Sequence, residues 1–177
     1  MRKNNYVLML AAALIAATPA AARDVTVQVD AASGPWRVDL NSDLMPYGIG
    51  DAKPPVVVPF DIGGGVIAII PSGTTAIPGR ADVPPIGLEN DAVDDKEVKK
   101  KRYPSFYAPK LLYPSYRHAL VAAFVDDKGV VVGRPFIVGK GIRVPIPENT
   151  AGLALGFNDI SFKGNTGALS VIVVIPD

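Results

Sequence analysis

The chain has 177 residues, with 18 basic side chains against 17 acidic ones, and contains no cysteine. A near-neutral protein has no electrostatic basis for binding nucleic acid or an anionic membrane surface. The lack of cysteine excludes disulfides, thiol chemistry and cysteine-based metal sites, so an exported form would depend on its hydrophobic core.

The N-terminal residues have the order of a secretory signal. A short basic start is followed by an apolar run from Tyr6 to Ala17, and small residues precede Arg23. The apolar run is too short to span a bilayer comfortably, although an uncleaved anchor is the alternative. We therefore expect residues 1–22 to be a signal peptide. Residues 23–177 are then expected to form one periplasmic or secreted domain with no membrane span.

The expected mature chain has strong β character. Its many prolines and glycines leave few windows long enough for a helix. The short apolar runs between them predict strands at Asp24–Val29, Val56–Phe60, Val66–Ile70, Ala119–Val125, Val130–Val132, Phe136–Val138, Ile142–Ile146, Leu153–Phe157 and Leu169–Ile175. Turn residues at 126–129, 133–135 and 139–141 separate the later runs. Many short strands with such turns indicate an all-β protein, an antiparallel β-sandwich.

The segment around 88–116 interrupts this pattern, and we expect it to be a long inserted loop or a short helix. Its first half passes from acidic to basic residues, an order that favours a helix from about Asp91 to Lys101. Its second half is rich in proline, which argues against a central strand. Four tyrosines in it could contact a sugar or protein partner, or could fold back over a sheet edge: Tyr103, Tyr107, Tyr113 and Tyr116.

The candidate site is the loop GFNDISFKGNTG, residues 156–167. Calcium prefers six to eight oxygen ligands, and Asp159 offers a carboxylate while Asn158 and Asn165 offer amide oxygens. Glycines in the loop would let backbone carbonyls face inward. Asn, Asp and Gly are also what an ordinary turn uses, so the composition alone leaves both interpretations open.

The run from Ala119 to the C-terminus resembles the C-terminal half of the PA-IL-like lectin family, bacterial galactose-binding proteins that hold the sugar through calcium. The residues that carry the resemblance are Leu153-Ala154-Leu155-Gly156, Asn158-Asp159, Phe162, Asn165 and Gly167. The match covers roughly the last 60 residues, is thin over 25–72 and fails across the insert. It implies a galactose-binding-domain-like β-sandwich.

The resemblance also implies a calcium site, with departures. Asp159 corresponds to the carboxylate that binds calcium and contacts the sugar, and Asn165 corresponds to the second of two adjacent Asx ligands. The first of that pair falls on Gly164, which has no side chain to offer. A carbonyl ligand would fall near 72–76. Affinity for calcium usually falls with each ligand lost.

Other residues give weaker signals. His118, the one histidine of the chain, has no nucleophile motif to accompany it, so we interpret it as structural. The paired carboxylates at 94–95 and 126–127 fall in polar stretches and are expected to be solvated. Trp36 either stacks on a sugar ring or anchors the core.

Two functions follow from these observations. The first is an exported, non-catalytic carbohydrate-binding protein that uses Asp159, Asn165 and Asn158 around calcium. Trp36 and the four tyrosines of the insert would then add contacts to the sugar. The second is a periplasmic or surface module for protein interaction or structure, which keeps the lectin-like fold without sugar binding. Neither is an enzyme.

Overall fold

The computed structural model describes residues 22–41, 51–92, 97–98, 101–102, 116–159 and 161–177. Nearly all of the described chain that has regular structure is β-strand in antiparallel sheets, as predicted. The expected signal peptide lies outside the described residues apart from Ala22. No described helix is long and apolar enough to cross a membrane.

The first sheet has six strands and is organised around the C-terminal strand. Its path runs β12-β3-β14-β4-β5, and β1 pairs with β14 as well. The bounds are β1 Arg23–Asp30, β3 Val66–Ser72, β4 Thr75–Ile77, β5 Arg80–Val83, β12 Ile142–Pro145 and β14 Thr166–Ile175. The ten-residue β14 is long enough to pair with β3 along its second half and with β4 at its start.

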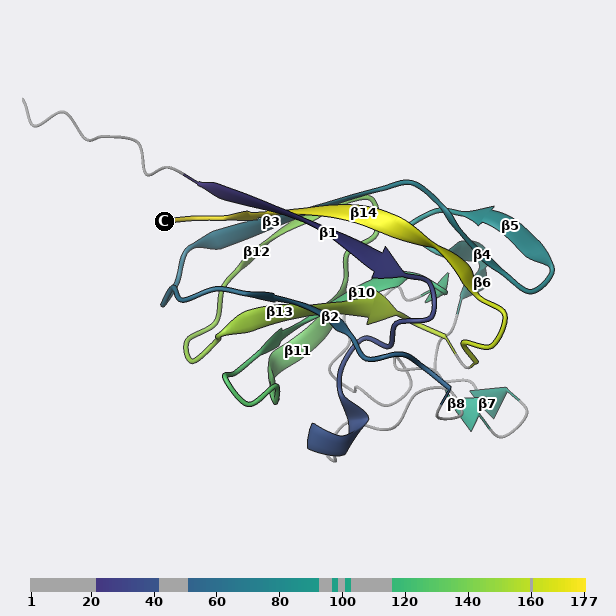
Figure 1. Ribbon diagram of the computed structural model, residues 1–177, viewed down its shortest axis with the longest axis horizontal. Helices are drawn as coiled ribbons and strands as arrows, with labels where there is room; N and C mark the ends of the chain where they lie inside the picture. Colours follow the sequence, from purple (N-terminus) through teal and green to yellow (C-terminus); the bar gives the residue numbers. More distant parts are fainter. Residues whose placement is uncertain (1–21, 42–50, 93–96, 99–100, 103–115, 160) are drawn as a thin grey trace, which may run out of the picture.

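The second sheet has four strands in the order β11-β10-β13-β2. They are β2 Val56–Pro59, β10 Leu120–Val125, β11 Val131–Ile137 and β13 Gly152–Phe157. Figure 1 shows this sheet as a layer below the one that contains β1, β3 and β14. The two layers make the antiparallel sandwich that the strand pattern predicts.

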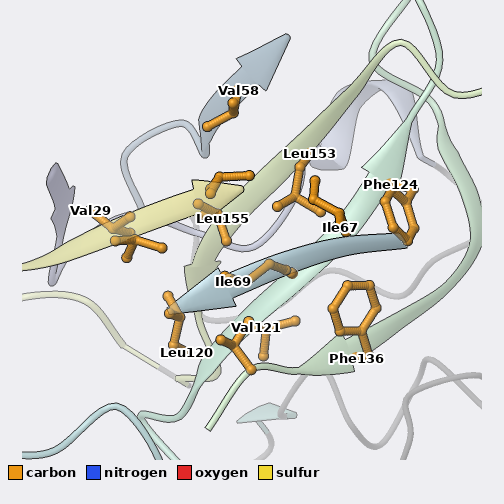
Figure 2. Close-up of a cluster of buried hydrophobic side chains, with 14 of the residues drawn as sticks. Val29, Val58, Ile67, Ile69, Leu120, Val121, Phe124, Phe136, Leu153 and Leu155 are labelled. Carbon is orange, nitrogen blue, oxygen red and sulfur yellow. The ribbon is translucent and has the colours of Figure 1, made fainter. Parts of the chain in front are cut away.

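The core lies between the two layers. Along β1, β3 and β14 inward residues alternate with exposed ones, the period of a sheet with one solvated face. All six residues of β10 and of β13 are buried, so both faces of these strands are covered. Figure 2 shows side chains of the two sheets packed against one another, among them Ile67, Ile69, Leu120, Val121 and Leu155.

The segment after β1 crosses from the first sheet to the second. The Phe157 N–H donates to the Ser33 carbonyl at 2.8 Å, and the Asn41 side chain accepts from the Val131 N–H at 2.7 Å. Between these contacts Trp36 is fully buried in the core cluster. The expectation that Trp36 could stack on a sugar is therefore corrected, because its ring presents no face to solvent; the core alternative is confirmed. A short 3-10 helix, η1 (Val38–Leu40), follows.

Two local predictions are wrong. Gly133-Arg134-Pro135 is not a turn between two strands but part of one strand, β11, whose pairing with β10 shifts register between Ala122 and Phe124. Gly133 has φ of +73°, and the glycine allows the β-bulge at this position.

In the insert, the described parts of the expected 91–101 helix are strand: β7 (Glu97–Val98) pairs with β8 (Lys101–Arg102).

The base of the insert is closed by a strand pair. Strand β6 (Leu88–Ala92) pairs with β9 (Tyr116–Arg117), which brings Leu88 opposite Arg117. The two ends of the insert therefore leave the sandwich at the same place.

Candidate functional site

Two of the predicted ligand residues, Asn158 and Asp159, lie directly after β13, where the chain passes the start of β10, and the third, Asn165, directly precedes β14. The His118 N–H donates to the Asn158 carbonyl at 2.6 Å, and the Asn158 N–H donates to the Ala119 carbonyl at 2.9 Å. These bonds continue the β10–β13 ladder by one step. The Asn158 side chain donates to the Tyr116 carbonyl at 2.9 Å, so its amide fixes β9. Asn158, Asp159 and His118 are all fully buried.

The Asp159 carboxylate is held by three side chains, two from the segment just before β10 and one from its own loop. Its Oδ2 lies 3.1 Å from His118 Nδ1 and accepts a hydrogen bond from Asn165 Nδ2 at 3.2 Å. Its Oδ1 lies 3.6 Å from Arg117 Nε. A buried carboxylate needs charge compensation and hydrogen-bond donors, and this arrangement supplies both. We call Thr75, Arg117, His118, Asp159 and Asn165 the polar cluster.

His118 joins the two sheets through this cluster. Its Nε2 lies 3.0 Å from the Thr75 hydroxyl of β4, and its ring stacks on Phe157 with the ring centres 4.4 Å apart. Beside a carboxylate Nδ1 is the donor of its pair, while Nε2 faces the Thr75 hydroxyl, which also donates to the Val83 carbonyl at 3.5 Å. His118 has φ of +59°, a conformation that non-glycine residues adopt rarely. The backbone on both sides of His118 passes close to Gly87, where a Cβ would lie 2.5 Å from the Arg117 carbonyl oxygen and 2.7 Å from the Ala119 nitrogen.

The order hydroxyl, imidazole, carboxylate is that of hydrolase triads, which the sequence did not lead us to expect. The Thr75 side chain is buried between the sheets, at 3% exposure. A groove of about 540 Å³ is lined by Arg117 but not by Thr75, His118 or Asp159. A nucleophile must reach its substrate, so we interpret the cluster as a structural network that ties β4 to the second sheet.

The cluster, as arranged, does not fit a calcium ion. Calcium needs several converging oxygens, whereas donors face the Asp159 carboxylate: an imidazole, an amide NH₂ and a guanidinium. Among the described residues there is no group of three or more His, Asp or Glu side chains that could hold a metal. The two predicted ligands Asp159 and Asn165 are in direct contact. The contact is a hydrogen bond from the Asn165 amide NH₂ to the Asp159 carboxylate, so the two side chains do not present two oxygens to a common point.

The outer part of the candidate loop is held by a residue that sequence reasoning missed. Asp51 accepts hydrogen bonds from the Ser161 hydroxyl at 3.0 Å, the Phe162 N–H at 3.1 Å and the Lys163 N–H at 3.0 Å. Partial burial opposes ionisation of Asp51, but these bonds outweigh it and lower the pKa of its carboxyl. The loop therefore turns its N–H groups toward a carboxylate of the protein itself.

Replacing Asp51 by alanine is expected to lower the free energy of unfolding by about 1–2 kcal/mol at neutral pH, because two backbone donors and a hydroxyl lose a charged acceptor. The pKa of Asp51 is lowered in the folded state, so its contribution is present above the unfolded pKa and is lost as the pH falls below about 4. Urea denaturation at several pH values measures both effects. Asp61→Ala, at an exposed carboxylate, is the control; an equal loss in both variants would contradict the assignment.

Of the four tyrosines predicted as contact residues, Tyr116 lies in the described part of the chain, next to Arg117. Tyr116 is half-buried in β9, and its carbonyl is bonded by Asn158. Tyr103, Tyr107 and Tyr113 lie outside the described residues. The groove beside Arg117 is also lined by the β4–β5 turn and the start of β6: Ile77, Pro78, Gly79, Arg80, Gly87, Leu88 and Glu89.

Comparison with known proteins adds no identity to this geometry. No protein-family model matches the chain, and neither the curated proteins nor the solved structures compared with it give a match.

Proposed function

We propose that this chain is an exported, non-catalytic interaction module that keeps a lectin-like sandwich without calcium-mediated sugar binding. One observation carries the proposal: the Asp159 side chain has 0% exposure and is already engaged by His118 and Asn165. In the arrangement that the resemblance implies, the carboxylate of residue 159 would bind the ion and contact the sugar, so its oxygens would have to reach the surface. Here the carboxylate serves the packing of the two sheets.

Export is the part of the proposal that comes from the sequence. The basic, apolar and small segments of residues 1–22 have the order of a secretory signal, and the chain contains no cysteine. The charge balance supports protein or sugar partners rather than nucleic acid. Periplasmic or extracellular location is therefore proposed together with the function.

A calcium-dependent lectin is the second candidate, and one arrangement favours it. Strand β4 at Thr75, the carboxylate of Asp159 and the amide of Asn165 lie together, as the resemblance to the lectin family implies for the segments near 72–76, 159 and 165. In addition, Asn165 Oδ1 is buried and has no hydrogen-bond partner. Reversal of this amide would aim an oxygen toward Asp159.

Thermal unfolding in millimolar calcium and in chelator separates the two candidates. We expect the same melting temperature in both, since a ligand raises it only by binding the folded state. The Asn165→Ala variant serves as a control, because it removes a predicted ligand while leaving the Asp159 carboxylate. If calcium instead stabilises the unmodified protein and not this variant, the lectin candidate replaces our proposal, and galactose becomes the next ligand to add.

A further inference from the structure

Strand β1 is an edge strand with an ordered set of backbone groups facing outward. It pairs with β14 over its full length, from Arg23 opposite Ile175 to Asp30 opposite Ala168. The Ala31 N–H donates to the Gly167 carbonyl at 2.9 Å in the same register, so odd-numbered residues make the bonds to β14. In an antiparallel ladder the even-numbered residues then direct their N–H and C=O groups to the other side. On this edge, with which no described strand pairs, these residues are Asp24, Thr26 and Gln28, all with exposed side chains.

This edge has fewer of the usual devices against pairing with another strand than the other edges of the sandwich. Natural edge strands carry proline, inserted charges, bulges or very short lengths. The other edges of the two described sheets have such devices: Arg143 and Pro145 in β12, the Gly133-Arg134-Pro135 bulge in β11, Pro55 and Pro59 at the ends of β2, and Asp82 at φ +55° in the short β5. By contrast, β1 has eight residues, no proline or glycine, and a register without interruption. Two of its three charged side chains have partners within the chain, since Arg23 donates to the Pro59 carbonyl and Asp30 pairs with Lys53; Asp24 is the third.

We propose that β1 is a homodimer interface, at which two copies pair their β1 strands antiparallel around a two-fold axis at Thr26. In this register Thr26 faces Thr26 of the second copy, and Asp24 faces Gln28. Every outward N–H and C=O of the three residues then has a partner. The interface makes the first sheets of the two copies continuous.

The sequence of the strand favours this register over the one with the axis at Val27. A two-fold axis perpendicular to the sheet keeps even-numbered residues opposite even-numbered ones, because paired side chains share a face. Moving the axis to Val27 would set Asp24 opposite Asp30, and like charges directly opposite are unfavourable. With the axis at Thr26, the half-buried Val25 and Val27 also face each other across the copies, adding apolar contact.

The proposal rests on the proposed function only in that an interaction module needs a surface. It uses neither calcium nor the polar cluster. The two tests are independent. A monomeric protein would not contradict the calcium result, and a calcium response would not contradict the dimer.

Sedimentation equilibrium of the exported protein is the test, with two substitutions at one position. Gln28→Asp sets a carboxylate opposite Asp24 twice by symmetry, and should raise the dissociation constant of the dimer by about tenfold. Gln28→Lys sets an ammonium there and should leave the dimer as tight or tighter. A general effect of charge at the edge would weaken both alike. A monomer at all concentrations, or a dimer that both variants affect equally, would overturn the proposal.

The absence of cysteine gives a second measurement of the same register. Thr26→Cys places two thiols across the axis, where hydrogen-bonded partners have Cα atoms about 5.5 Å apart, within the range of a disulfide. Mild oxidation should therefore give a covalent dimer. The matched control is Arg143→Cys, exposed on the opposite edge strand β12, which should remain largely uncrosslinked. Equal crosslinking of the two variants would count against pairing through β1.

Discussion

Gly156→Ala is expected to lower the free energy of unfolding by about 3 kcal/mol or more, enough to leave the protein unfolded if its stability is modest. A Cβ at this position would lie 2.0 Å from the Gly34 carbonyl oxygen, 2.2 Å from its carbon and 2.6 Å from the Pro35 nitrogen. These are backbone atoms, so no side-chain rotation relieves the clash. The crossing segment would have to move away from β13, and Trp36 would move with it.

Two other glycines make this a graded test. A Cβ at Gly152 would lie 3.0 Å from the Val58 carbonyl oxygen, and a Cβ at Gly63 would meet no heavy atom within 4 Å. Chemical denaturation of the three alanine variants should therefore rank them Gly63, Gly152, Gly156 in increasing loss of stability. A Gly156 variant as stable as the Gly63 variant would mean that Gly34 and Pro35 do not lie against β13.

The structure gives a physical reason for the glycine at position 156. In the sequence it is the last residue of Leu153-Ala154-Leu155-Gly156, a pattern that supports a resemblance but states no cause. In the structure it is the place where the chain after β1 passes over the second sheet, and the adjacent Phe157 N–H bonds the Ser33 carbonyl. A glycine inside a strand often marks such a close approach of two backbones.

The strands that could be predicted are the ones whose own residues specify them. Alternation in β1 and apolar runs in β3, β10, β13 and β14 are local signals that burial reinforces. Strands β4 and β5 were missed because they are short and pair through β14 and each other, which no local pattern reveals. The structural meaning of glycine and proline was also ambiguous in the sequence. Gly133-Arg134-Pro135 is compatible with a turn between two strands and with the bulge that it forms within one strand.

The site was predictable only where it is local. Asp159 and Asn165 are close in sequence, and they do contact each other. Thr75 lies 43 positions from His118, and His118 lies 41 from Asp159, so their contact depends on how the sheets pack. Asp51 reaches the loop from 110 positions away. The sequence showed which polar side chains the loop contains. It did not show which groups elsewhere in the chain form hydrogen bonds with the oxygens and N–H groups of the loop.

The second large effect on stability is expected from a substitution in the polar cluster. Asp159→Ala should lower the free energy of unfolding by about 3–5 kcal/mol, because it removes the carboxylate that compensates buried donors. His118 Nδ1 loses its acceptor, and Arg117 loses the negative charge 3.6 Å from its Nε. Asp159→Asn should cost less, since it keeps the shape and one accepting oxygen. Urea denaturation at neutral pH measures both variants.

A double-mutant cycle shows whether the cluster acts as a unit. His118→Phe keeps an aromatic ring to stack on Phe157 while removing both ring nitrogens. Combined with Asp159→Asn, it should give a loss smaller than the sum of the single losses by about 1–3 kcal/mol, as expected for side chains in direct contact. Additive losses would mean that imidazole and carboxylate contribute independently, and the cluster would not be what ties β4 to the second sheet. Strong coupling would explain the carboxylate at position 159 by the packing of the sandwich, and the resemblance at that residue would then need no calcium ion.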